Sequence, residues 1–303
     1  MGSANETSPT PRGTCTSSGG IPIGLWDFGG HGPDLLLVHA TGFCASVFTP
    51  LTRSLHGHFH CYGLDLRGHG TSEHMTDQDF RWERFADDVL AAVDHLRLQR
   101  PLAIGHSCGG ASLLLAEEQR PGTFAGLACF EPVVPTDDEP VLPRREGNAL
   151  HDGALRRRAE FPSREAAFEN FASKPPFSSL HPEALWRYVL DGFEVIPTSE
   201  GGDGKAVRLR CRPEEEAEVY AHAFSHGAFT HLASVRCPVA LACGADTDAF
   251  GPEYLERYAS RLADCSISVL PGLGHFGPLE DPDAVAAWVV AAFVPPVGAA
   301  SPR

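Results

Sequence analysis

The chain has 303 residues, 43% of them hydrophobic, and a formal net charge of −15. This length is enough for one large or two modest domains with a substantial core. Because nucleic acids and many membrane surfaces are anionic, the strong negative charge argues against either as a partner. No apolar run approaches the roughly 20 residues that a transmembrane helix needs. We therefore expect a globular protein, and the charge by itself says little about its substrate.

The two ends of the chain are expected to lie outside the folded core. Residues 1–13 are polar and rich in Ser, Thr, Pro and Gly, without the apolar stretch of a secretory signal. Residues 295–303 are also predicted to form a flexible tail. The nine cysteines are odd in number and show no Cys-x-x-Cys spacing, which favours reduced thiols in a cytoplasmic protein.

The first half of the chain alternates between apolar runs typical of strands and stretches with helical periodicity. Residues 14–27 predict a hairpin that turns at Gly19-Gly20. Residues 34–39 are almost continuously apolar, as in a strand buried on both faces of a parallel sheet. The next elements are predicted as helix 45–55, strand 58–64, helix 80–96, strand 101–104, helix 110–118 and strand 124–130. This alternation predicts an α/β fold with a mostly parallel sheet between two layers of helices.

The character of the sequence changes between about residues 132 and 235, where prolines and charged residues are frequent. Helices are predicted there at 149–161, 164–172, 183–190 and 213–224. The alternation of strands and helices then resumes, with strands at 237–243 and 266–270 and helices at 252–262 and 283–293. The simplest interpretation is an α/β core formed by 14–132 and 236–294, interrupted by a mainly helical cap at 133–235. We expect this cap to lie over the end of strand 101–104.

The most informative stretch is Gly105-His106-Ser107-Cys108-Gly109, which lies between a predicted strand and a predicted helix. Strand, Gly-x-Ser-x-Gly and helix is the context of a nucleophile elbow, a turn so tight that only small residues fit two positions either side of the serine. The N–H groups at the start of the helix favour negative charge that develops at this point. Ser107 is therefore the candidate nucleophile.

A serine hydroxyl needs a neighbouring base, and the base needs a carboxylate to orient it. The candidate base is His275, in the glycine-rich loop that follows the last predicted strand. Three carboxylates compete for the third position. Asp248, just past strand 237–243, is our first choice, and Asp246 and Glu131 are the alternatives.

The oxyanion that forms during acyl transfer needs backbone N–H donors aimed at it. One donor is expected to be the N–H of Cys108, directly after the nucleophile. The other should come from the loop 39–43, where we favour the N–H of Thr41 over that of Phe43.

Together, the stretches 39–42 and 65–72, the elbow and Gly274-His275 make the chain resemble the α/β-hydrolase-fold enzymes, and among these the capped, esterase-like serine hydrolases. The resemblance spans roughly residues 20–294. In this family the acid usually occupies the position that Thr247 holds here, and Asp248 matches relatives that place it one residue later. Glu131 resembles the acid position of haloalkane dehalogenases, but Ser107 stands where those enzymes have an aspartate nucleophile.

The resemblance implies a serine hydrolase that cleaves an ester, thioester or lactone of a small molecule through an acyl-enzyme, with no metal or organic cofactor. The alternatives are a C–C bond hydrolase or a cofactor-free perhydrolase with the same triad, and a non-catalytic ligand receptor on the same scaffold. A homodimer is left open.

Three further features have less direct interpretations. We expect Asp65 and Arg67 to hold loops near the site rather than to act in catalysis. Cys44 and Cys108 are expected to fill space or line a pocket. The run 156–158, three arginines on the predicted cap, is interpreted as a solvated helix face, with a charged latch or a docking point for an anionic group as alternatives.

Overall fold

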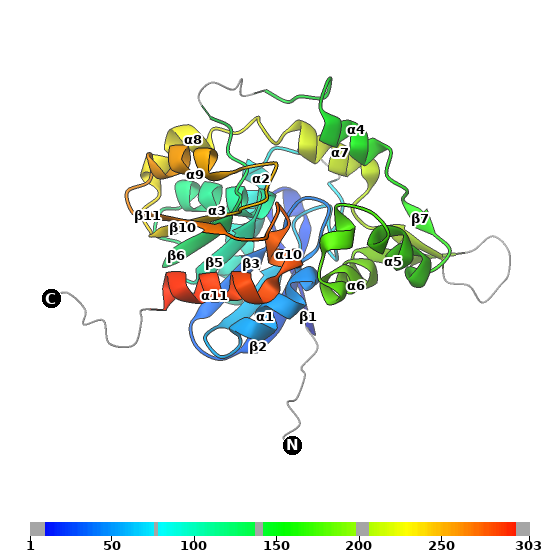
Figure 1. Cartoon of the computed structure of the whole chain (residues 1–303), viewed down its shortest axis with the longest axis horizontal. Helices are drawn as coiled ribbons and strands as arrows, with labels where there is room; N and C mark the ends of the chain where they lie inside the picture. The colour runs from blue at the N-terminus through cyan, green and yellow to red at the C-terminus, as the bar shows by residue number, and fades with distance from the viewer. Residues whose placement is uncertain (1–9, 76–77, 137–141, 198–205, 295–303) are drawn as a thin grey trace, which may run out of the picture.

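The computed structural model describes residues 10–75, 78–136, 142–197 and 206–294 (Figure 1). Its core is an eight-stranded sheet in the order β1-β2-β4-β3-β5-β6-β10-β11. β2 pairs antiparallel with β1 and β4, and all other neighbours are parallel. The strands are β1 (Thr10–Thr16), β2 (Pro22–Gly30), β3 (Asp34–Val38), β4 (His60–Leu64), β5 (Leu102–His106), β6 (Gly126–Phe130), β10 (Val239–Gly244) and β11 (Cys265–Leu270). The predicted α/β fold is confirmed.

Helices cover both faces of this sheet (Figure 1). One face carries α1 (Thr49–Leu55) and α11 (Pro282–Phe293), and the other carries α2 (Glu83–Leu96), α3 (Cys108–Gln119) and α9 (Pro252–Ala259). β3 is continuously apolar because both of its faces are buried. Leu36 and Val38 belong to the core on the α2–α3 side, whereas Leu35 and Leu37 belong to the core on the α1–α11 side.

The cap inserted after β6 is more mixed than we predicted. It contains α4 (Ala149–Leu155), α5 (Arg164–Ala172), α6 (Pro182–Asp191) and α7 (Pro213–Ala221), and also a three-stranded antiparallel sheet in the order β7-β9-β8. These strands are β7 (Glu160–Phe161), β8 (Phe193–Ile196) and β9 (Ala206–Leu209). The predicted helix 149–161 ends at Leu155, because Phe161 instead pairs with Val207 across the small sheet. Short α8 (Ala228–His231) leads back to the core.

The expected N-terminal boundary also needs correction. Residues 10–13, which we assigned to a terminal tail, pair with β2 as the start of β1. The short run had no alternation strong enough to predict a strand, and its partner in β2 supplies the hydrogen bonds that define it. The rest of the predicted tail and residues 295–303 lie outside the described residues.

None of the nine cysteines, all of which lie in the described ranges, forms a disulfide. Eight are buried and Cys265 is partly exposed. Burial raises the pKa of the Cys108 thiol to about 12, so this side chain stays protonated at neutral pH. The prediction of reduced, space-filling cysteines agrees with this arrangement.

The segment 65–72 is built into the core by its polar side chains. The buried Asp65 carboxylate accepts hydrogen bonds from the Trp26 indole at 2.9 Å, the Ala45 N–H at 2.7 Å and the Thr71 N–H at 2.8 Å. Arg67 and Asp88 form an ion pair at 2.7 Å with both side chains 0% exposed. These contacts tie β2, β4 and α2 together, which is the structural role that we expected of this segment.

Four histidines in the core are held in the neutral form. Burial lowers the pKa of His39 and of His226 to about 4 and that of His69 to about 3, and it also lowers the pKa of His106. The contacts of His39 explain why it cannot gain a proton easily. Its Nδ1 lies 2.8 Å from the Ala40 carbonyl oxygen, and its Nε2 accepts the Leu66 N–H at 3.0 Å. A proton on Nε2 would face another N–H group.

We predict that this core loses stability in mild acid. The unfolded histidines have a pKa of about 6.5, above the folded values, so the unfolded chain binds more protons between about pH 4 and 6.5. The stabilisation is therefore complete above pH 6.5 and is lost as the pH falls, by at most about 1.4 kcal/mol per pH unit for each histidine. Urea unfolding at pH 7.5 and 5.5 should show this loss.

His226→Gln and the exposed His58→Gln form a matched pair for this measurement. His226 is buried, with its Nε2 3.2 Å from the Val133 carbonyl oxygen. Between pH 7.5 and 5.5 the wild-type protein should lose part of its free energy of unfolding. We expect this loss to shrink by about 1 kcal/mol in His226→Gln and to stay unchanged in His58→Gln. Equal losses in all three proteins would contradict the assignment.

Candidate active site

The site is built around the sharp turn between β5 and α3. Ser107 has φ 54° and ψ −115°, a conformation that non-glycine residues rarely adopt. A Cβ atom on Gly105 would lie 2.6 Å from the Gly109 carbonyl carbon, and one on Gly109 would lie 2.1 Å from the Val38 carbonyl oxygen. Both glycines are therefore required for the close packing of α3 against the strand ends, and the predicted elbow geometry is present.

His275 reaches this turn from the loop between β11 and the short helix α10 (Gly277–Glu280). Its Nε2 lies 3.2 Å from Ser107 Oγ, and its Nδ1 lies 2.7 Å from Glu131 Oε2. A proton on Nδ1, held by the carboxylate, leaves the Nε2 lone pair directed at the serine hydroxyl. The three side chains therefore form a continuous chain of hydrogen bonds.

Glu131 follows β6 directly, with a positive φ of 44°, and its side chain is 0% exposed. Besides His275, it accepts hydrogen bonds from the Gly244 N–H at 3.0 Å, the Thr247 hydroxyl at 2.8 Å and the Phe250 N–H at 3.4 Å. Several donors hold the carboxylate, which compensates for its burial and fixes its orientation. Thr247, the residue at the family's usual acid position, thus helps to hold Glu131.

The placement of Asp248 and Asp246 corrects our first choice of carboxylate. Both side chains are exposed in the loop after β10, and no hydrogen bond within the described ranges joins either of them to His275. β6 and β10 are adjacent and parallel, so all three acidic candidates come from neighbouring strand ends. The turn at Glu131 directs its side chain to His275, whereas in the described structure neither aspartate of the loop 245–249 forms a hydrogen bond with this histidine.

The expected oxyanion donors lie next to the serine. Cys108 is the first residue of α3, where N–H groups have no partner within the helix. Thr41 is buried, lines the same pocket as Ser107, and has its hydroxyl beside the Cys108 thiol. The Phe43 N–H, our second candidate, instead donates to the Ala40 carbonyl oxygen at 3.2 Å. The roles of Cys108 and Thr41 remain predictions that this arrangement favours.

His106 is a supporting residue that sequence reasoning did not single out. Its Nε2 lies 2.8 Å from the His275 carbonyl oxygen, and its ring packs edge-on against Phe276 at 6.0 Å between ring centroids. Burial, with His275 nearby, lowers the pKa of His106, so a neutral ring donates this hydrogen bond. Its position inside the elbow pentapeptide was the only hint of this role.

A pocket of about 360 Å³ opens beside Ser107 and His275. Most of its wall is apolar and comes from both the core and the cap. The lining residues are Ala40, Thr41, Trp82, Ser107, Val133, Leu150, Pro176, Tyr220, Ala223, Phe224, Asp248, Ala249, Phe250, His275 and Phe276. Such a concave, mostly apolar cavity with a few polar groups is typical of a small-molecule site. Trp82, Tyr220 and Phe250 are lining residues that the sequence pattern did not identify.

Charged side chains of the cap pack against the loop 39–43. Arg157 forms an ion pair with the buried Glu216 of α7 and a hydrogen bond to the Tyr188 hydroxyl of α6. Glu216 packs so closely on the loop that a Cβ atom on Gly42 would lie 2.6 Å from its Oε1. Arg156 is exposed, and Arg158 stacks 4.4 Å from the Phe161 ring centroid. Arg157 thus departs from the solvated helix face that we expected, and its two partners both belong to the cap.

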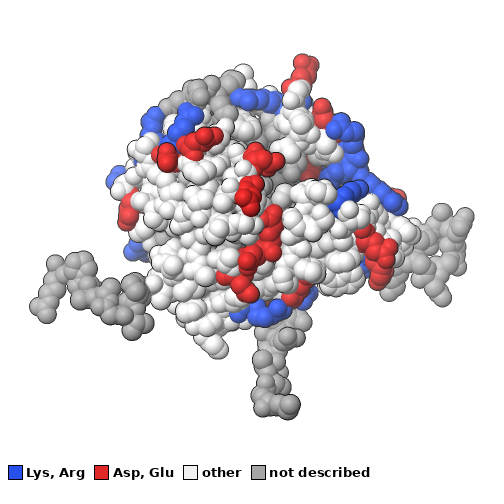
Figure 2. Space-filling model, in the orientation of Figure 1, with Lys and Arg blue, Asp and Glu red and all other residues white. Residues whose placement is uncertain are grey.

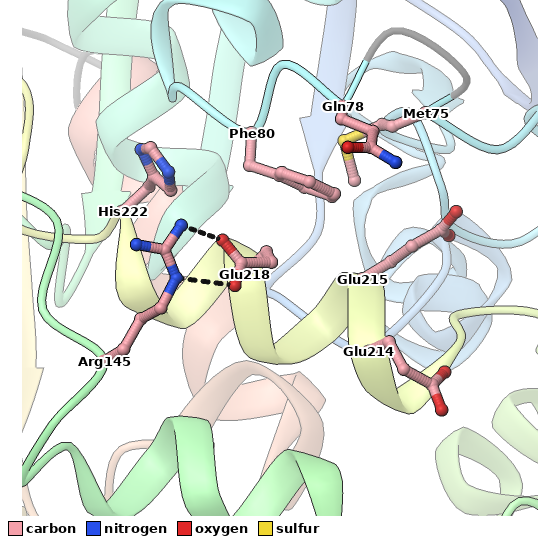
Figure 3. Close-up of a pocket in the computed structure, with 8 residues that line it drawn as sticks. All are labelled: Met75, Gln78, Phe80, Arg145, Glu214, Glu215, Glu218 and His222. Carbon is pink, nitrogen blue, oxygen red and sulfur yellow. Dashed lines mark hydrogen bonds and ion pairs between the residues drawn. The ribbon is translucent and has the colours of Figure 1, made fainter.

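A second hollow, of about 440 Å³, lies between α7 and the side chains of Met75, Gln78 and Phe80 (Figure 3). Its wall is strongly polar, with three glutamates of α7 and the pair Arg145–Glu218 joined at 2.8 and 2.6 Å. It shares no lining residue with the pocket at Ser107 and contains no serine or cysteine beside a base. The candidate active site is therefore the pocket at Ser107.

The described part of the chain gives no sign of a metal centre or a membrane-spanning helix. No group of three or more His, Cys, Asp or Glu side chains in it is arranged to hold a metal ion. None of its helices is both long and apolar enough to cross a membrane.

Comparison with known proteins gives local sequence matches and a similarity of the whole fold. The chain is 34% identical over 112 residues to the monoglyceride lipase of Homo sapiens, which covers 35% of this chain and 36% of that protein. It is 35% identical over 85 residues to a pimeloyl-[acyl-carrier protein] methyl ester esterase of Vibrio atlanticus, covering 28% of this chain and 31% of that protein. The matched region thus spans about a third of these relatives.

Solved structures resemble nearly the whole chain. E-2-(acetamidomethylene)succinate hydrolase superposes with a TM-score of 0.75 at 19% identity, covering 93% of this chain and 99% of that one. A thermophilic esterase from Thermogutta terrifontis gives a TM-score of 0.67 at 20% identity, covering 92% and 96%. At such identities the similarity shows the fold alone. The model of the alpha/beta hydrolase family, however, matches residues 35–288, so this chain belongs to the alpha/beta hydrolase family.

Proposed function

We propose that the protein is a serine esterase that hydrolyses an ester, thioester or lactone of a small molecule through an acyl-enzyme. The observation that carries this proposal is the chain of hydrogen bonds from Ser107 through His275 to Glu131 at the mouth of an apolar pocket. Such an arrangement activates a serine hydroxyl, because the base is in contact with it and is itself oriented by a carboxylate.

In the proposed reaction, Ser107 Oγ attacks the carbonyl carbon of the substrate while His275 Nε2 takes its proton. The Cys108 and Thr41 N–H groups stabilise the oxyanion that forms. His275 then returns the proton to the leaving alcohol or thiol, and the acyl group stays on Ser107. A water molecule then gives a proton to His275 Nε2 and attacks the acyl carbon, and His275 returns that proton to Ser107 Oγ as the acid is released. Glu131 stabilises the positive charge on His275 in both half-reactions.

The names of the sequence relatives support ester bonds as the target, since they include a lipase and a methyl ester esterase. C–C bond hydrolysis and perhydrolysis would use the same three side chains, and nothing in the pocket favours them over ester hydrolysis. A receptor without activity has no need of a serine in contact with its base, so it is the weaker alternative.

One prediction from the proposed mechanism concerns the nucleophile. Ser107→Ala should abolish labelling by a fluorophosphonate probe and lower the turnover of p-nitrophenyl acetate by a factor on the order of 10⁴, because no other group can form the acyl-enzyme. Gel fluorescence and release of nitrophenolate are the readouts. Wild-type protein that is folded but neither labelled nor active would contradict the proposal.

Another prediction separates the candidates for the carboxylate that orients His275. Glu131→Gln should lower kcat for the same ester by a factor on the order of 10⁴, because the amide neither stabilises the charged His275 nor holds its reactive tautomer. Asp248→Asn is the comparison and should stay within about threefold of wild type for this small neutral ester, since no hydrogen bond joins its carboxylate to His275 in the described structure. Circular dichroism checks that both variants are folded. The reverse order of effects would assign the acid to Asp248.

A further inference from the structure

The wall of the pocket beside Ser107 carries one carboxylate. Asp248 is the only Asp, Glu, Lys or Arg among the described residues that line it. Its side chain is exposed, and within the described ranges neither an ion pair nor a hydrogen bond links it to another residue. Since Glu131 occupies the position beside His275, the Asp248 carboxylate is available to act on whatever enters the pocket.

Three arginines of the cap do not line this pocket, and each has a partner. Arg144 lies against Phe224, 5.1 Å from its ring centroid, and lines a neighbouring hollow rather than this pocket. Arg145 is paired with Glu218, and Arg157 with Glu216. Acidic side chains also run down the middle of the face shown in Figure 2, and the chain as a whole carries a charge of −15. An anionic group entering the pocket therefore meets no free counter-charge on its described wall.

The size and polarity of the pocket make this charge important for binding. In a cavity of about 360 Å³, a carboxylate on the acyl group of a substrate lies within several Å of Asp248. It would leave water for a mostly apolar wall without a partner, which is unfavourable, and it would also be repelled by a like charge. A neutral group pays neither penalty, and a cationic group is attracted.

We propose that Asp248 is a specificity-determining residue, which selects esters with an uncharged or cationic acyl group and rejects those whose acyl group carries a carboxylate. This inference rests on the proposed esterase function. It assigns Asp248 to substrate selection instead of to the support of His275.

Three methyl esters of similar length test the proposal: methyl pentanoate, monomethyl glutarate and methyl 4-(trimethylammonio)butanoate. Acid release in a pH-stat at pH 7.5 gives kcat/KM for each. Wild type should prefer the neutral and cationic esters, and Asp248→Asn should reduce the preference for the neutral over the anionic ester roughly tenfold, mainly through KM, as expected for loss of one nearby charge. Raising NaCl to 0.5 M should likewise reduce the wild-type preference for the neutral over the anionic ester, because salt screens the charge of Asp248.

Asp246→Asn is the matched control, because Asp246 is an exposed carboxylate in the same loop that does not line the pocket. It should retain the wild-type preference. An unchanged preference in Asp248→Asn, or equal changes in the two variants, would overturn the proposal, as would a wild type that turns over monomethyl glutarate best.

A binding measurement separates this inference from the proposed function. Phenylboronic acid and 4-carboxyphenylboronic acid bind serine nucleophiles, and Trp82 in the pocket wall provides a fluorescence readout of their Kd values. The Kd of 4-carboxyphenylboronic acid divided by that of phenylboronic acid should fall roughly tenfold in Asp248→Asn. The same ratio should stay constant in Asp246→Asn. If this holds while no ester is turned over, the esterase proposal fails and the role of Asp248 stands. If both variants keep the wild-type ratio, the role of Asp248 is wrong even where esters are hydrolysed.

Discussion

The whole site depends on how closely the first turn of α3 packs against the ends of β3 and β5. Gly109 leaves no room for a side chain against the Val38 carbonyl, and Gly105 leaves none against Gly109. This packing forces Ser107 into its unusual backbone conformation and places it in the wall of the pocket at the edge of the sheet. It also brings the start of α3 beside Thr41, so the nucleophile and the expected oxyanion donors are positioned by a single constraint.

The charged part of the site shows how a buried carboxylate can be supported. Glu131 is removed from solvent, yet its two oxygens face donors from β10, from the loop that follows it and from His275. Because these donors belong to parts of the chain more than a hundred residues away, the carboxylate is oriented only when β6 and β10 lie side by side. The hydrogen bonds that compensate for its burial also hold His275 in position.

The cap completes the site by supplying part of the pocket wall and by packing on the loop 39–43, which carries Thr41. Tyr220 and Leu150 reach the pocket from the cap, while Glu216 lies against Gly42 and is held by Arg157. Movement of the cap would therefore change both the shape of the pocket and the contacts of the loop that carries Thr41.

The amino-acid sequence by itself determined the alternation of strands and helices, the elbow at Ser107 and the loop histidine His275. These features depend on local patterns: apolar runs, helical periodicity and glycines around a tight turn. The choice among Glu131, Asp246 and Asp248 depended on tertiary structure, because all three follow neighbouring strands and only the direction of each turn decides which carboxylate points inward. The small cap sheet was likewise invisible in the sequence, since β7 is two residues long and exists only by pairing with β9. The pocket wall joins residues from distant segments, and only their packing brings them together.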